Sequence, residues 1–218
     1  MDLDFHEHGA ARLHGAAVPF LSRLEAIVAK LPGDRAGIRL HGVEGLAELL
    51  APQATGVADL LGDDARPVRA ILFDKSAAAN WALGWHQDRT IAVKARADMP
   101  GYGPWTIKAG MQHVEPPFAL IERMVTIRVH LDDVPADNAP LLIAPGSHRL
   151  GRIAEDALGD VVERCGTAAC LAAAGDLWVY ATSIVHASAT AQGSGRRRVL
   201  QVDYSAQALP QGLDWLGV

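Results

Sequence analysis

Residues 124–131, with the sequence MVTIRVHL, alternate between apolar and polar side chains. Every second residue from Val125 onward is apolar, whereas Thr126, Arg128 and His130 are polar. Because successive side chains of a strand point to opposite faces, this period of two predicts a strand with one face in an apolar core. The other face is expected to meet either water or a polar cavity.

Short strands are predicted on both sides of this segment, at residues 68–73, 141–144, 176–180, 183–188 and 198–204. Segments rich in Pro, Gly, Asn and Asp separate the later strands. Residues 189–195 are expected to form a hairpin turn that makes strand 183–188 antiparallel to the last strand. Late strands with irregular connectors predict a mainly β protein with flanking helices, of the β-sandwich or jelly-roll class.

The first third of the chain is predicted to be mostly helical. Apolar residues recur there at three- and four-residue steps, which indicates helices at 16–31, near 43–50 and near 54–61. The sequence contains no linker that would divide two domains. We therefore expect one domain over residues 1–218, with helical support in 1–65 and the β core in 66–205.

Composition and charge restrict the kinds of molecule that this protein is expected to bind. Half of the residues are hydrophobic and 21% are charged, as in an ordinary globular protein. A net charge of -5 argues against nucleic acid and anionic membranes, and the apolar stretches are too short to span a bilayer. The polar, acidic start of the chain does not have the pattern of a signal peptide, and Cys165 and Cys170 are too few for a disulfide scaffold. A cytoplasmic protein that binds a small molecule is expected.

Three residues have the chemistry of a metal site. In an extended chain His86 and Asp88 point to the same side, so an imidazole and a carboxylate can reach one ion. This pair alone is a weak signal, and His186 is the predicted third ligand. Two histidines and one carboxylate leave three octahedral positions open, which is typical of non-haem iron(II) sites that use dioxygen.

Ser188 and Arg197, which follow the predicted ligand His186 in the sequence, are suited to bind a carboxylate group. Ser188 shares the face of His186, and the expected hairpin would bring Arg197 back towards it. A guanidinium binds a carboxylate through two parallel hydrogen bonds, as the far carboxylate of 2-oxoglutarate requires. Arg197 stands between Arg196 and Arg198, and strand alternation places it on the face opposite to theirs.

The order of these motifs resembles that of the phytanoyl-CoA dioxygenase family of iron(II)- and 2-oxoglutarate-dependent oxygenases. The resemblance runs from about Val68 to Tyr204 and rests on Trp85-His86-Gln87-Asp88, Leu131-Asp132-Asp133, Pro145-Gly146-Ser147-His148, Gly175-Asp176, His186-Ala187-Ser188 and Arg197. It implies a double-stranded β-helix, a cupin-like jelly roll.

For the individual residues, the resemblance implies iron(II) at His86, Asp88 and His186, and 2-oxoglutarate at Ser188 and Arg197. Arg128 falls where members of the family place a side chain of the co-substrate pocket, usually an aromatic one. Its role is left open between 2-oxoglutarate, substrate and neither.

The implied function is a dioxygenase that uses O2 to hydroxylate a small molecule and releases succinate and CO2. Trp105, Lys108 and His113 are candidates for substrate contact, because they lie on the long connector 99–117 and such connectors are often lids or binding loops. One alternative is a non-catalytic jelly roll that binds a small molecule or a partner. Another is a cupin-like isomerase or hydrolase, in which Arg197 would have no role.

Overall fold

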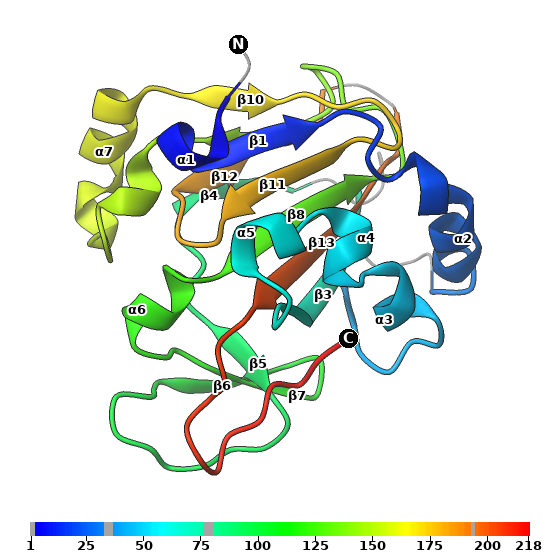
Figure 1. Cartoon of the computed structure of the whole chain (residues 1–218). Coiled ribbons are helices and arrows are strands. Elements are labelled where there is room, and N and C mark those ends of the chain that lie inside the picture. Colours follow the sequence, from blue (N-terminus) through cyan, green and yellow to red (C-terminus); the bar gives the residue numbers. More distant parts are fainter. Residues whose placement is uncertain (1–2, 33–36, 76–80, 193–194) are drawn as a thin grey trace.

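The computed structural model describes residues 3–32, 37–75, 81–192 and 195–218. Two antiparallel sheets form its centre (Figure 1). The larger sheet has six strands, in the order β1 (Ala10–Leu13), β11 (Leu177–Ala181), β8 (Val125–His130), β13 (Arg197–Ser205), β3 (Arg66–Lys75) and β2 (Gly37–Leu40). The second has four, in the order β10 (Ala168–Cys170), β9 (Leu141–Ile143), β12 (His186–Ser188) and β4 (Leu83–His86).

The chain passes from one sheet to the other and back as it moves through β11, β12 and β13. This winding is that of a jelly roll, so the predicted mainly β fold is confirmed. Side chains from both sheets meet in one apolar cluster, which includes Ile143 of β9, Tyr180 of β11 and Val199 of β13.

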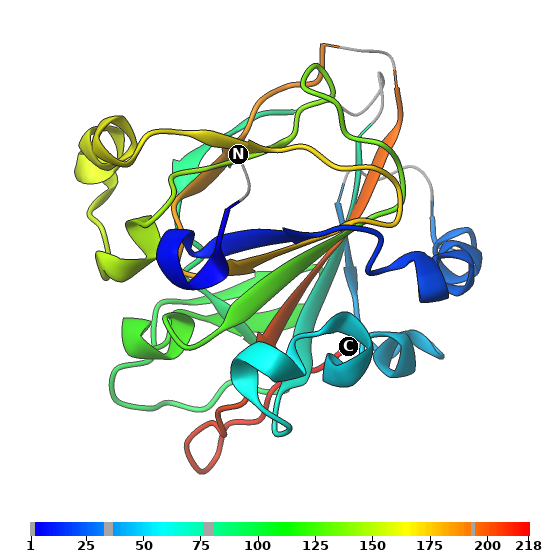
Figure 2. The ribbon, with the colours of Figure 1, turned by 45° about the horizontal axis from the view of Figure 1, so that its top comes forward.

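Short helices surround the sheets. They are α1 (Phe5–His8), α2 (Val18–Val28), α3 (Leu46–Leu49), α4 (Pro52–Thr55), α5 (Ala58–Leu61), α6 (Phe118–Ile121) and α7 (Leu158–Cys165), with 3-10 turns η1 (Ser147–Arg149) and η2 (Glu155–Ala157). Helices α2 to α5 cover the outer face of the larger sheet (Figure 2). No helix within the described ranges has the length and apolar character needed to cross a bilayer.

Strand β8 has the two faces that its alternation predicts. Ile127 and Val129 are fully buried on the outer face, in the core beneath the helices. Thr126, Arg128 and His130 are also buried, with at most 4% exposure. The polar face of β8 therefore looks into the space between the sheets and not into water.

The predicted hairpin between residues 183–188 and 198–204 is wrong. Strand β12 pairs with β4 and β9, and β13 pairs with β3 and β8. Both edges of each strand are therefore occupied, and the segment between them crosses from one sheet to the other. Within the expected turn, residues 193 and 194 lie outside the described part of the chain.

Several short strands were not expected from the sequence. Strands β1 and β2 come from the predominantly helical first third and form the two edges of the larger sheet. The connector 99–117 contains a hairpin of β6 (Trp105–Lys108) and β7 (Met111–Val114), which pairs with β5 (Ile91–Val93) in a third sheet. The helix expected near 54–61 is divided into α4 and α5, because Gly56 adopts a left-handed conformation with φ 74°.

Asp176 joins the first strand to the turn before β11. Its carboxylate accepts hydrogen bonds from the backbone N–H of Gly15 at 2.8 Å and of Ala173 at 2.7 Å, and it forms an ion pair with Arg12. Burial alone would raise the pKa of Asp176, but the two N–H donors and Arg12 lower it. The ionised side chain therefore stabilises the folded state.

We expect Asp176→Asn to lower the free energy of unfolding by about 2 kcal/mol at neutral pH. Because the pKa of the folded form lies below the unfolded value of about 3.9, this stabilisation is complete above that pH and is lost as the pH falls through the folded pKa. Urea unfolding should thus give a smaller difference from wild type at about pH 3 than at pH 7. Asp133→Asn, which alters a single exposed contact to the N–H of Ala174, is the control and should have a smaller effect.

Candidate metal centre and co-substrate pocket

His86, Asp88 and His186 converge in the structure. One ligand atom of each lies within 4.8 Å of those of the other two. His86 ends β4 and His186 begins β12, and the two residues are directly opposite each other in the antiparallel pair. Their ring centroids are 4.2 Å apart, and Asp88 follows two residues after β4. Strand pairing thus brings together residues that are distant in the sequence.

The backbone fixes how the two imidazoles are presented. Nδ1 of His86 lies 2.8 Å from the carbonyl oxygen of Gly84, and Nδ1 of His186 lies 2.9 Å from that of Ile184. Because a carbonyl only accepts, each Nδ1 carries the proton and donates it. This tautomer leaves the lone pair of Nε2 free for a metal ion.

Arg69 of β3 controls the charge of Asp88. Its Nη2 lies 3.3 Å from the carboxylate of Asp88, and its Nε donates to the buried carboxylate of Asp203. Burial alone would raise the pKa of Asp88, but Arg69, followed by His186 and His86, lowers it to about 2. Asp88 is therefore an anion at neutral pH, as a metal ligand must be. Two imidazoles and one carboxylate in this arrangement fit an iron(II) ion.

The sequence interpretation did not single out Arg69. A signal was present, because this charged residue interrupts the apolar run that predicts strand 68–73. A charged side chain in a buried strand needs a partner of opposite charge, but the sequence does not show which one.

A cavity of about 220 Å³ opens beside the three predicted ligands. Ser188, Arg128 and Arg197 also line it. Arg197 is 2% exposed and donates from Nη1 to the carbonyl of Ala139, while its Nε has no partner in the described part of the chain. Arg128 lies over the ring of Phe73, and its buried Nε and Nη1 are also without partners there.

Arg128 and Arg197 form a site for negative charge. Burial, followed by Arg128, lowers the pKa of Arg197 to about 9. Within the described residues neither guanidinium forms an ion pair with a carboxylate, so a bound anion would relieve this unfavourable burial.

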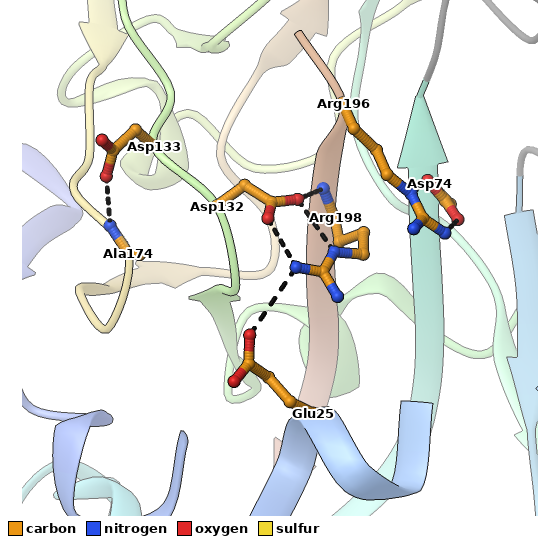
Figure 3. Close-up of polar contacts among 7 residues, drawn as sticks. All are labelled: Glu25, Asp74, Asp132, Asp133, Ala174, Arg196 and Arg198. Carbon is orange, nitrogen blue, oxygen red and sulfur yellow. Dashed lines mark hydrogen bonds and ion pairs between the residues drawn. The ribbon is translucent and has the colours of Figure 1, made fainter. Parts of the chain in front are cut away.

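The predicted alternation around Arg197 is confirmed. Arg196 turns outward and binds Asp74, with distances of 2.9 and 2.6 Å (Figure 3). The side chain of Arg198 forms two hydrogen bonds to Asp132, its backbone N–H forms a third, and its Nη2 approaches Glu25 of α2 to 3.6 Å (Figure 3). Only the middle arginine of the three therefore reaches the cavity.

Lys75 is a second pocket residue that the sequence interpretation missed. It is 1% exposed and stands opposite Arg197 in the pairing of β3 with β13. Its Nζ donates to Ser188 Oγ at 3.0 Å and to the carbonyls of Trp81 and Ala189. The Ser188 hydroxyl accepts from Lys75 and donates to the carbonyl of Ala189 at 3.4 Å, a long contact that an acceptor of a ligand can replace. No local pattern in the sequence reveals this contact, which depends on long-range strand pairing.

The three candidates for substrate contact lie in different surroundings. Lys108 lines the cavity, with Nζ 3.4 Å from Thr90 Oγ1. Trp105 packs in a separate apolar cluster under Arg96, and His113 is fully buried behind the wall. Burial lowers the pKa of His113 to about 4, so this histidine is neutral.

Comparison with known proteins agrees with this geometry. The family model for phytanoyl-CoA dioxygenase (PhyH) matches residues 5–199. The chain therefore belongs to the phytanoyl-CoA dioxygenase family, and the resemblance seen in its motifs is confirmed. The class of enzyme that this defines is the 2-oxoglutarate-dependent non-haem iron dioxygenases.

Solved structures share the fold at low sequence identity. EctD from S. alaskensis, in its apo form, is 18% identical, with a TM-score of 0.68 over 98% of this chain and 78% of that one. HygX from Streptomyces hygroscopicus, with nickel and 2-oxoglutarate bound, is 15% identical, with a TM-score of 0.59 over 92% and 84%. SnoN, a non-haem α-ketoglutarate-dependent epimerase from nogalamycin biosynthesis, is 14% identical, with a TM-score of 0.59 over 97% and 89%. No curated protein matches the sequence.

We expect His186→Gln to weaken iron(II) binding by at least about 100-fold, since changing a residue that only orients a ligand already costs about 10- to 100-fold. Metal content after anaerobic loading and desalting measures the effect. His113→Gln is the matched control, because His113 has the same Nδ1 contact to a carbonyl two residues earlier but lies outside the group of three. Equal iron content in the two variants would exclude His186 as a ligand.

Proposed function

We propose that this chain binds iron(II) through His86, Asp88 and His186 and uses 2-oxoglutarate and O2 to hydroxylate a small molecule, with release of succinate and CO2. One observation carries the proposal: the group of three opens onto a cavity that also holds the buried, unpaired guanidinium groups of Arg128 and Arg197. The structure of HygX with nickel and 2-oxoglutarate provides a precedent in a protein of the same fold.

Bound iron(II) and 2-oxoglutarate would supply the oxidising power. The side chains of the protein bind and orient. Arg69 keeps Asp88 ionised, and the carbonyls of Gly84 and Ile184 hold the protons on the far nitrogens of the two imidazoles. The buried inner faces of the two sheets limit the access of water to the reacting atoms.

The co-substrate is assigned to the Ser188 end of the cavity. Arg197 and the Ser188 hydroxyl would bind its far carboxylate, and Lys75 orients that hydroxyl. Arg128 is included in the same site, because its charge acts on both Arg197 and Lys75. Two guanidinium groups can together neutralise a dianion.

The same proposal covers the whole chain as one oxygenase domain over 1–218, with mainly helical support in 1–65 and the β core in 66–205. Edge strands β1 and β2 of the larger sheet, contributed by the first third, support it. A cytoplasmic location is also proposed. It is supported by Cys165 and Cys170, both unpaired thiols, which suit a reducing compartment.

Anaerobic titration of iron(II) and 2-oxoglutarate tests this function. The wild type is expected to develop the weak visible charge-transfer band of chelated 2-oxoglutarate, and His186→Gln is expected to lack it. Absence of the band in the wild type would refute the oxygenase, whereas an equal band in the variant would refute the ligand assignment. Succinate release in a metabolite screen then measures turnover.

Arg197→Gln should weaken 2-oxoglutarate binding by at least about tenfold, because it removes a charge-assisted pair from a buried site. Arg198→Gln is the matched control one residue away, since Arg198 points to Asp132 and not to the cavity. Titration of the charge-transfer band gives both affinities. A similar loss in both variants would indicate a general effect of removing charge and not a contact with the co-substrate.

A further inference from the structure

The cavity has a second group of cations, at its Asp88 end. Arg39 of β2 and Lys108 of β6 both line the wall and are half-buried. They come from an edge strand of the larger sheet and from the small third sheet. Neither element contributes to the predicted metal ligands or to the 2-oxoglutarate contacts.

These two cations are not neutralised by protein groups. Arg39 forms no side-chain hydrogen bond or ion pair with any described residue, and its buried Nε has no acceptor. In the part of the chain that the structure describes, Lys108 has only the hydroxyl of Thr90, at 3.4 Å. The carboxylate of Asp88 acts on the charge of both cations, but it is paired with Arg69 and assigned to the metal.

The charges that act on Arg39 and Lys108 differ from those that act on the cations at the co-substrate end of the cavity. Burial, followed by Arg69, lowers the pKa of Arg39, and burial, followed by Arg69 and Arg39, lowers that of Lys108. At the other end, burial followed by Arg197 and Arg128 lowers the pKa of Lys75. The cations of the cavity therefore repel one another in two separate groups, and a single dianion at Arg197 would neutralise only one of them.

Cations on the surface of this protein differ from Arg39 and Lys108 in their exposure and in their neighbours. Lys94 and Arg96 have side chains that are 63% and 59% exposed, and each is close to an aspartate. Arg39 and Lys108 instead line a cavity in which, among the described residues, the one carboxylate is that of Asp88, already paired with Arg69. A solvated charge therefore does not account for them.

We propose that Arg39 and Lys108 bind an anionic group of the substrate, a carboxylate or a phosphate, with Thr90 as an additional hydroxyl donor. The substrate is then a small anion that enters on the Asp88 side, while 2-oxoglutarate occupies the Ser188 side. This inference rests on the proposed function, because it assigns the second end of the same cavity. It explains why a protein of net charge -5 concentrates positive charge there.

The test uses the full chain loaded anaerobically with iron(II) and 2-oxoglutarate. Inorganic phosphate and acetate are titrated in separate experiments at constant ionic strength, and binding is measured by calorimetry. The wild type should bind at least one probe saturably. Arg39→Gln and Lys108→Gln should each bind it about tenfold more weakly, since each removes one charge-assisted contact. Lys94→Gln is the matched control and should bind like the wild type.

The affinity for 2-oxoglutarate, read from the charge-transfer band, should be unchanged in all three variants. No saturable binding of either probe, or undiminished binding in the double variant Arg39→Gln/Lys108→Gln, overturns the inference and leaves the proposed function intact. If these variants lose 2-oxoglutarate while Arg197→Gln retains it, the co-substrate lies at the Asp88 end, and the inference and the assignment of Arg197 both fail. Preference for phosphate or for acetate supports the inference and identifies the anion.

Discussion

Burying a positive charge without a carboxylate beside it is costly, and the cavity of this protein does so repeatedly. Among the described residues, its walls contain Arg39, Arg69, Lys75, Lys108, Arg128 and Arg197, against the single carboxylate of Asp88. Elsewhere the chain pairs its charges well, as the contacts of Arg196 and Arg198 show (Figure 3). The cavity thus gathers buried positive charge without matching carboxylates, and this is the property that a site for two anionic molecules requires.

Among these cations, only Arg69 forms ion pairs with carboxylates of the described residues. It lies between Asp203 and Asp88, so it stabilises the sheet and lowers the pKa of a predicted metal ligand at the same time. Lys75 satisfies its three donor positions with two carbonyls and the hydroxyl of Ser188, but no carboxylate of the described ranges neutralises it. The pocket thus contains cations whose positions are fixed by hydrogen bonds. It also contains guanidinium groups whose N–H donors still lack an acceptor among the described residues.

Local patterns in the sequence predicted much of this arrangement. The alternation in β8 and around Arg197 identified which side chains share a face, because it depends only on the geometry of one strand. The approach of Arg197 to Ser188 was also expected, but for the wrong reason. The two strands lie in different sheets, and the space enclosed between the sheets, not a hairpin, brings these residues to one cavity.

What the sequence did not reveal depends on pairing between distant segments. Strands β1, β2, β6 and β7 have four residues each, too few to show a clear period. The roles of Arg69 and Lys75 depend on the neighbours that β3 acquires in the sheet. No pattern within β3 itself identifies those neighbours.

The pairing of β3 with β13 has a consequence for how this enzyme can change. Lys75 stands opposite Arg197 and Arg69 stands opposite Asp203, so one pair of strands fixes both ends of the cavity. A slip of a single residue in either strand would turn the two side chains of that strand to the outer face. Insertions or deletions in these strands would therefore destroy the metal end and the co-substrate end together. The edge strand β2 and the β6–β7 hairpin can accept new side chains without moving that framework, which makes them the places to redesign when a different substrate is wanted.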